Sequence, residues 1–186
     1  MPRRPTPLTR TWASALICAT ASAAAGLSTP APAAAAREPL GPSVTLGPVL
    51  KHANCHVRGG LPDAGCTPGA RFSKVTTTRV CRVGYTAAAR NVSTRTRKAV
   101  YASYDINPPF NGRNGELDHL VSLELGGSNS RTNLFPEAAR PRPGSHEKDR
   151  LENRLHDDMC NGQITMRHAQ QLIAGNWVNA YRSRFS

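Results

Sequence analysis

The chain has 186 residues, of which 39% are hydrophobic and 19% charged, and it carries a formal net charge of +12 at pH 7. Domains commonly run to roughly 100–200 residues, so this length argues against several domains and suits one domain plus a removable segment. A chain this basic is drawn to polyanions such as nucleic acid, anionic cell-wall polymers or lipid headgroups, although charge says nothing about the fold.

Residues 1–36 are expected to be a secretory signal peptide. They begin with three arginines, continue as an apolar run over 12–27 and end in an Ala- and Pro-rich stretch, which is the order that a signal peptide needs. Ser and Thr dilute the run, and it is shorter than the ~20 strongly apolar residues of a membrane-spanning helix. We therefore expect a secreted, monomeric protein without a membrane anchor. Removing the three arginines leaves a net charge of +9.

Four cysteines remain after residue 36, namely Cys55, Cys66, Cys81 and Cys160. An even number in an oxidising compartment indicates two disulfides. Three connectivities are open, and we favour Cys55–Cys66 as a local loop with Cys81–Cys160 as a long-range link. Structural zinc is the alternative, but no pair has the Cys-x-x-Cys spacing that such sites usually show.

Residues 37–78 are rich in Pro and Gly, which predicts an irregular arm pinned by a disulfide and not a packed layer. Residues 79–186 should form the remaining domain. Short helices are expected over 86–90 and 93–104, the second capped by Ser93. The aromatic residues expected to build core against them are Tyr85, Tyr101, Tyr104 and Phe110.

The stretch 116–125 is apolar at every odd position from 117 onward except 119. This period predicts a half-buried strand in which His119 occupies an inward position. Two glycines at 126–127 then supply a turn, and 133–136 form a short return strand. Helices are expected from Ser145 to about Met159 and over 165–181, so the fold class is α+β and mostly helical.

This hairpin contains the most specific motif of the chain. Asp118-His119, the Gly126-Gly127 turn and Asn133-Leu134-Phe135-Pro136 together resemble the HNH endonuclease family, whose core is a ββα unit holding one divalent metal. The stretches 148–153, 160–162 and 169–170 resemble secreted bacterial proteins of this type, and the resemblance covers about residues 79–182. It implies that residues 79–186 are an HNH-type nuclease domain.

The resemblance implies a role for each motif residue. His119 would be the general base, Asp118 a metal ligand, and Asn133 the residue that ties the hairpin loop. Phosphodiester hydrolysis needs a base near neutral pH and a positive charge at the phosphate, and a hard cation prefers oxygen ligands. We expect Mg²⁺, with Mn²⁺ or Zn²⁺ as alternatives. Adjacent strand residues face opposite ways, so the strand should bend or end near 118–119 if both side chains serve one site. The alternative interpretation is that His119 is a core histidine and Asp118 an acid in a turn.

The third HNH residue is missing from its usual place, and the following helix offers candidates. Its apolar stripe is formed by Leu151, Leu155 and Met159. At 100° per residue, Lys148 and Glu152 lie on or beside this stripe, whereas His146 and Asn153 lie away from it. Inward charges are costly unless paired or coordinated. We predict Glu152 as the second metal ligand, with Lys148 pairing with it or reaching a phosphate and His146 as second choice; an ordinary i,i+4 salt bridge is the alternative.

Three further arginines, Arg131, Arg140 and Arg142, flank the expected site. They are expected to contact the phosphate backbone without sequence preference, or else to form a solvated rim. DNA is expected to be the partner before RNA. The competing functions are a secreted polyanion-binding protein on a catalytically silent HNH scaffold, and a toxin directed at cell walls or competitors.

Overall fold

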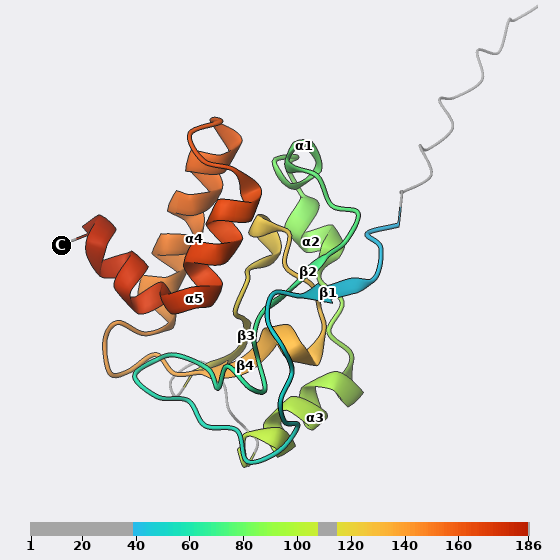
Figure 1. The fold of residues 1–186 in the computed structure, drawn as a ribbon, viewed down its shortest axis with the longest axis vertical. Coiled ribbons are helices and arrows are strands. Elements are labelled where there is room, and N and C mark those ends of the chain that lie inside the picture. The colour runs from blue at the N-terminus through green and yellow to red at the C-terminus, as the bar shows by residue number, and fades with distance from the viewer. Residues whose placement is uncertain (1–38, 108–114, 186) are drawn as a thin grey trace, which may run out of the picture. The chain divides into compact units, whose positions relative to one another are not determined.

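The computed structural model describes residues 39–107 and 115–185. The expected signal peptide and Phe110 lie outside these residues. From residue 38 onward the chain forms one compact unit, in which helices predominate over two small antiparallel sheets (Figure 1). The expected α+β class is therefore confirmed.

The Pro- and Gly-rich arm is more regular than the sequence indicates. Strand β1 (Ser43–Thr45) pairs with β2 (Ala70–Phe72), and the disulfide Cys55–Cys66 closes the loop between them. Backbone hydrogen bonds join this segment to the later hairpin, for example from Phe72 N–H to the Gly126 carbonyl, 3.0 Å. The arm is pinned by the expected disulfide and is irregular between its two three-residue strands, while β2 also finds partners far away in the sequence.

Three short helices follow the arm. They are α1 (Thr77–Val80), α2 (Tyr85–Ala89) and α3 (Thr94–Ser103). The Ser93 side chain accepts the Thr96 N–H, which is the bond that an N-cap makes, so the predicted cap is confirmed. The three described tyrosines expected in the core are buried, each less than 10% exposed.

The central hairpin is shorter than its alternating pattern suggests. Strand β3 (Glu116–His119) pairs antiparallel with β4 (Leu134–Glu137), and two 3₁₀ turns, η1 (Leu123–Leu125) and η2 (Arg131–Asn133), lie between them. The strand ends at His119. This was expected, because adjacent strand residues face opposite sides and Asp118 and His119 could not otherwise serve one site. Beyond it, Gly127 packs so close to the Val121 carbonyl that a Cβ would lie 1.8 Å from the oxygen, and this tight return prevents residues 120–125 from continuing as a strand.

Two long helices complete the unit. Helix α4 (Ser145–Cys160) is followed by α5 (Met166–Phe185), which is kinked at Asn176. Ser145 is not the cap of α4: Gly144 precedes the helix, and its N–H donates to the Glu147 carboxylate, 2.9 Å. The disulfide Cys81–Cys160 ties the end of α4 to the end of α1, so both favoured disulfides are confirmed.

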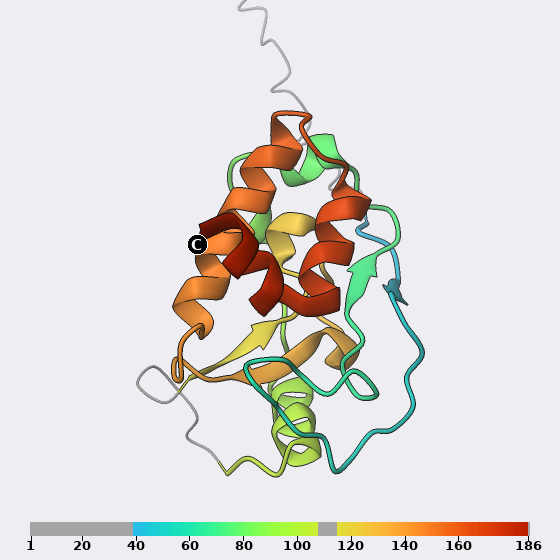
Figure 2. The same ribbon diagram turned by 60° about the vertical axis from the view of Figure 1, so that its left-hand side comes forward.

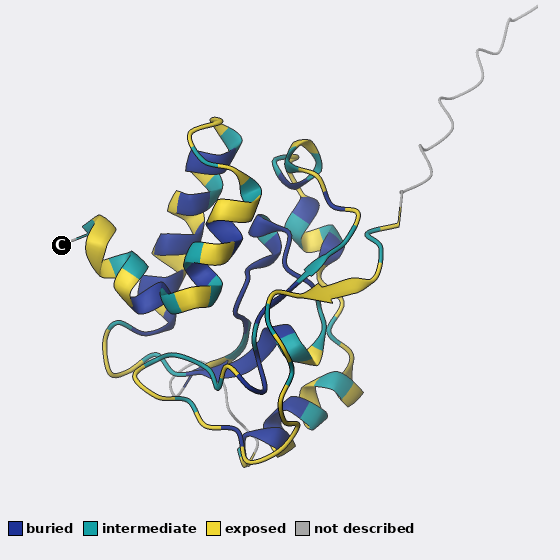
Figure 3. Ribbon diagram, in the orientation of Figure 1, coloured by how far each residue is buried: buried dark blue, intermediate teal, exposed yellow. Residues whose placement is uncertain are grey.

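The core lies around the hairpin and its 3₁₀ turns. Helix α4 packs against α5 and η1, while α3 packs against β4, so the hairpin lies between these helices (Figure 2). Buried residues follow the inner sides of the helices and much of the segment between η1 and β4 (Figure 3). The apolar stripe of α4 and Trp177 of α5 are at most 2% exposed, so the predicted inward face of α4 is confirmed.

Candidate active site at the hairpin and helix α4

Asn133 holds the loop that carries the site. Its side chain is fully buried and makes four hydrogen bonds. The amide oxygen accepts the N–H groups of Val121 and Ala70, and the amide nitrogen donates to the carbonyls of Val121 and Ser128. One side chain thus joins the two ends of the loop and the arm. This is the contact pattern expected of a residue that ties the hairpin.

Asp118, Lys148 and Glu152 form a buried charge cluster. The Lys148 side chain is fully buried, and its Nζ donates to Asp118 Oδ2 at 2.5 Å, to the His119 carbonyl at 2.8 Å and to Glu152 Oε1. Lys148 and Glu152 are therefore inward-facing, as the helical geometry predicted. The pair is more than an ordinary helix salt bridge, because it also fixes α4 to β3.

Glu137 is a fourth member of the cluster that the sequence did not reveal. It stands two residues beyond Phe135, the register partner of Asp118, and so lies on the same face of the hairpin. It is 1% exposed, and its nearest oxygen is 3.9 Å from Lys148 Nζ. Neither carboxylate oxygen has a hydrogen-bond partner among the described residues.

The carboxyl groups of this cluster differ in their affinity for protons. Burial raises the pKa of Glu152 to about 8 and raises that of Glu137 well above its usual value, with Asp118 adding to the effect for Glu137. Burial also acts on Asp118, but the adjoining Lys148 ammonium outweighs it and lowers the pKa of Asp118. Three acids thus surround one ammonium, and burial, the largest cause of the raised pKa of both glutamates, favours their protonated forms.

His119 directs its Nε2 toward Asn129, the residue that fixes which ring nitrogen carries the proton. Asn129 donates its amide N–H to the Ala89 carbonyl, 2.8 Å, and accepts the Asn91 N–H, 3.3 Å, which together set the orientation of its amide group. Its oxygen lies 3.1 Å from His119 Nε2. An amide oxygen can only accept, so Nε2 carries the proton and the lone pair of the neutral ring lies on Nδ1.

His119 is held in its neutral form. The residue is 2% exposed, and burial lowers its pKa to about 4, with the Asp118 carboxylate opposing this shift and the charges of Arg90 and Lys148 adding to it. A neutral imidazole beside a carboxylate cluster has the protonation state that a general base requires.

A polar hollow of about 280 Å³ opens beside Glu152. It lies where α2, η1 and α4 meet. Its lining consists of Thr86, Arg90, Ser122, Leu123, Glu124, Asp149, Glu152 and Asn153. Arg90 is exposed and also lines a second hollow, with Arg97 and Leu117. Arg90 has no local signal in the sequence, because its position depends on how α2 packs against η1.

The remaining predicted residues do not gather at the cluster. His146 is exposed in the first turn of α4 and has no hydrogen bond or ion pair to Asp118 or Glu152. Arg131 donates to the His52 carbonyl in the arm, 3.0 Å. Arg140 is exposed, and Arg142 Nε lies 3.5 Å from Glu147.

Comparisons with protein-family models, curated proteins and solved structures give no match for this chain. Within the described residues, no helix has the length and apolar character needed to cross a membrane. A function for the site must therefore be argued from its geometry and chemistry.

Proposed function

We propose that the chain is a secreted, metal-dependent endonuclease of the HNH type that hydrolyses phosphodiester bonds of DNA, with RNA as an alternative substrate and little sequence preference. One observation carries the proposal. A neutral histidine of fixed tautomer directly follows an ionised aspartate, and the buried Lys148 ammonium connects that aspartate to Glu152 of the next helix. The hairpin and α4 would then form the ββα core of the site.

The donor set fits a divalent cation. Glu137 is buried without a hydrogen-bond partner among the described residues, and the one Lys148 ammonium is shared among Asp118, Glu152 and Glu137, so a divalent cation would add positive charge to a group of three carboxyls around a single ammonium. Hard cations prefer carboxylate oxygens. Asp118 and Glu152 would hold the ion, and Glu137 would lie behind them. His146 would not be a ligand in this arrangement and could become one only if α4 moved. A bound Mg²⁺ supplies positive charge that stabilises the phosphate transition state and the leaving oxygen.

The residues of the chain have separate tasks in this scheme. His119 takes a proton from the attacking water at Nδ1, and Asn129 keeps that nitrogen unprotonated. Substrate binding has to bring Nδ1 into contact with water, because the residue is 2% exposed. Arg90, whose charge influences His119 and which lines both hollows, is placed to bind the phosphate. Asn133 keeps the loop in shape.

A second function is favoured by Lys148. Its ammonium group lies between Asp118 and Glu152, where it neutralises the two ligands without any metal. A scaffold of this kind could bind polyanions through its positive charge and remain catalytically silent. The two functions differ in one respect, since only the nuclease turns over substrate.

Incubation of the purified chain with plasmid DNA, with and without a chelator, distinguishes them. We expect cleavage with Mg²⁺ or Mn²⁺ that a chelator abolishes and that His119→Ala removes, while the exposed control His168→Ala cuts at the wild-type rate. Asp118→Ala should recover some activity at high metal concentration, whereas no metal concentration replaces a missing base. Retained binding without cleavage under every metal condition supports the silent scaffold. Wild-type cleavage by folded His119→Ala contradicts the nuclease mechanism.

A further inference from the structure

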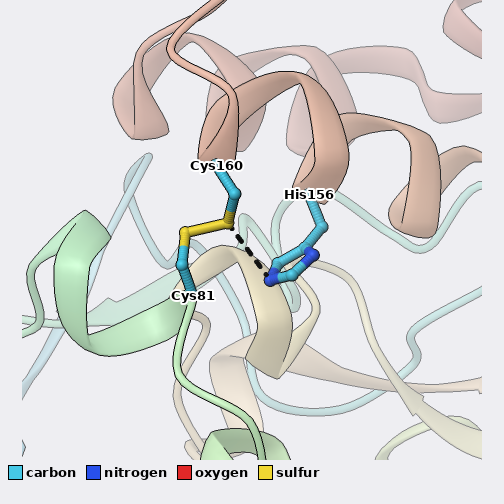
Figure 4. A group of neighbouring side chains, drawn as sticks. All are labelled: Cys81, His156 and Cys160. Carbon is cyan, nitrogen blue, oxygen red and sulfur yellow. Dashed lines mark hydrogen bonds between the residues drawn. A yellow bond between two sulfur atoms is a disulfide. The ribbon is translucent and has the colours of Figure 1, made fainter.

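A second cluster of metal-binding residue types lies at the C-terminal end of α4 and begins one turn beyond Glu152. The imidazole of His156 and the sulfurs of Cys81 and Cys160 point toward one another (Figure 4). All three ligand atoms lie within 4.8 Å of one another, and His156 Nε2 is 3.4 Å from Cys160 Sγ. His156 and Cys160 are four residues apart on one helix, so both stand on the same face.

In the oxidised protein these residues cannot hold a metal through thiolates, because the sulfurs are bonded to each other. Two equivalents of a thiol reductant change this by thiol–disulfide exchange. The two reductant thiols are oxidised to one disulfide, and the two electrons and two protons that they give up convert the Cys81–Cys160 disulfide into two thiols. A metal ion that binds them then displaces the two protons.

We propose that the dithiol form binds one Zn²⁺ through Cys81, Cys160 and His156, with water completing the tetrahedron. Zn–S bonds of about 2.3 Å in a tetrahedron place two sulfurs about 3.8 Å apart. Disulfide-bonded sulfurs are about 2 Å apart in general, so the two sulfurs need to move about 2 Å farther from each other. The zinc would then replace the disulfide as the link between α1 and α4. This inference does not rest on the proposed function.

The surroundings of His156 suit a zinc ligand. Its Nε2 faces the sulfurs, while its other ring nitrogen, Nδ1, lies 3.9 Å from the Asp157 carboxylate. Zinc-bound histidines commonly have such a carboxylate behind them, which orients the ring and raises its basicity. The imidazole already directs Nε2 toward the sulfurs, whereas 3.9 Å at Nδ1 is longer than a hydrogen bond and leaves the carboxylate to move closer on binding.

The other disulfide lacks these features. Cys55 and Cys66 are 1% and 7% exposed, whereas Cys81 and Cys160 are both partly exposed and more open to a reductant. In the described part of the chain, no His, Asp or Glu completes a ligand group with Cys55 and Cys66. The zinc site is thus specific to the pair that joins α1 and α4.

Metal titration of the full chain tests the site, with Zn²⁺ alone and with Co²⁺ as a spectroscopic probe. After reduction with a phosphine, we expect one Co²⁺ per chain with thiolate-to-cobalt absorption, its displacement by Zn²⁺, and a higher melting temperature with zinc. The oxidised protein should lack the thiolate-to-cobalt absorption, which distinguishes this site from any cation held by Asp118 and Glu152. His156→Gln should weaken binding at least about tenfold, while the exposed control His168→Gln should leave it unchanged.

The reduced double variant Cys81→Ala, Cys160→Ala reports any zinc held by Cys55 and Cys66. Equal affinity in this variant overturns the site, as does wild-type affinity in His156→Gln. Absence of thiolate-to-cobalt absorption in the reduced wild type also overturns it, whether or not the reduced chain remains folded.

Discussion

Asn129 decides which nitrogen of His119 can take a proton. Its amide oxygen accepts from both His119 Nε2 and Asn91 N–H, and its amide nitrogen is committed to the Ala89 carbonyl. A flipped amide would lose the last two bonds, so the orientation is well determined. The residue follows a Gly-Gly turn and looks in the sequence like an ordinary turn residue, which is why it was not among the predicted site residues.

Asn129→Ala is therefore predicted to remove the constraint that keeps the proton of the neutral His119 ring on Nε2. Nε2 loses its acceptor, so a fraction of the neutral rings should shift the proton to Nδ1, and cleavage should fall in proportion while KM changes little. Ring nitrogen chemical shifts of His119 report the tautomer independently of activity. Asn91→Ala, which keeps the hydrogen bond between Asn129 and His119, is the matched control. An unchanged tautomer in Asn129→Ala would refute the positioning role.

His119 should also make folding stability depend on pH. Its pKa is about 4 in the folded protein against a usual value of 6.5, so the unfolded chain binds a proton that the folded protein excludes between these values. The contribution of His119 to the free energy of unfolding is therefore full above pH 6.5. It is lost as the pH falls toward 4, and the loss amounts to roughly 3 kcal/mol. Urea unfolding at several pH values should show a flatter profile for His119→Gln than for wild type. His168→Gln should follow wild type; identical profiles for both variants would count against the shift.

At the scale of elements, Lys148 is the link between α4 and β3. It is fully buried and its ammonium contacts Asp118, Glu152 and the His119 carbonyl. Removing one member of such a buried group leaves uncompensated charge. The stability of the hairpin–helix junction should therefore depend on the number of charges that remain, and not only on packing.

Lys148→Met is predicted to destabilise the protein by about 3–5 kcal/mol, whereas Lys98→Met on the exposed side of α3 should cost little. Adding Asp118→Asn should recover part of the loss, because the unpaired carboxylate is removed. Mg²⁺ should raise the melting temperature of Lys148→Met more than that of wild type, since the cation replaces the ammonium between Asp118 and Glu152. Loss of stability without recovery and without a response to Mg²⁺ would show that Lys148 acts only through packing.

The elements that could be predicted are those with a local period. Helix α4 repeats its apolar positions, so the inward direction of Lys148 and Glu152 followed from helical geometry alone. The alternation over 116–125 predicted the burial of His119 but overstated the strand, since the close approach of Gly127 to the Val121 carbonyl is a tertiary contact. Glu137 was missed because a lone acid among Leu, Phe and Pro carries no sign that another element buries it.

At the scale of the whole molecule, the net positive charge is the feature that predicts a polyanionic partner. The chain carries a net charge of +12, from 24 Lys and Arg against 12 Asp and Glu, and most of its acids in α4 are buried or paired. Long-range attraction to a polyanion then supplies affinity without reading sequence. The arginines differ, however, in how free they are to contact a phosphate.

Binding to duplex DNA is predicted to weaken steeply with salt and to be nearly equal for two unrelated sequences. Each phosphate contact contributes about −0.9 to the slope of log K against log salt concentration, so Arg140→Gln should reduce the slope by roughly one. Arg131→Gln should change it less, because its guanidinium already donates to the His52 carbonyl. Fluorescence anisotropy at several salt concentrations, with a catalytically inactive His119→Ala background, measures both variants without cleavage. A slope near zero, or a strong preference for one duplex, would mean that binding does not rest on phosphate contacts.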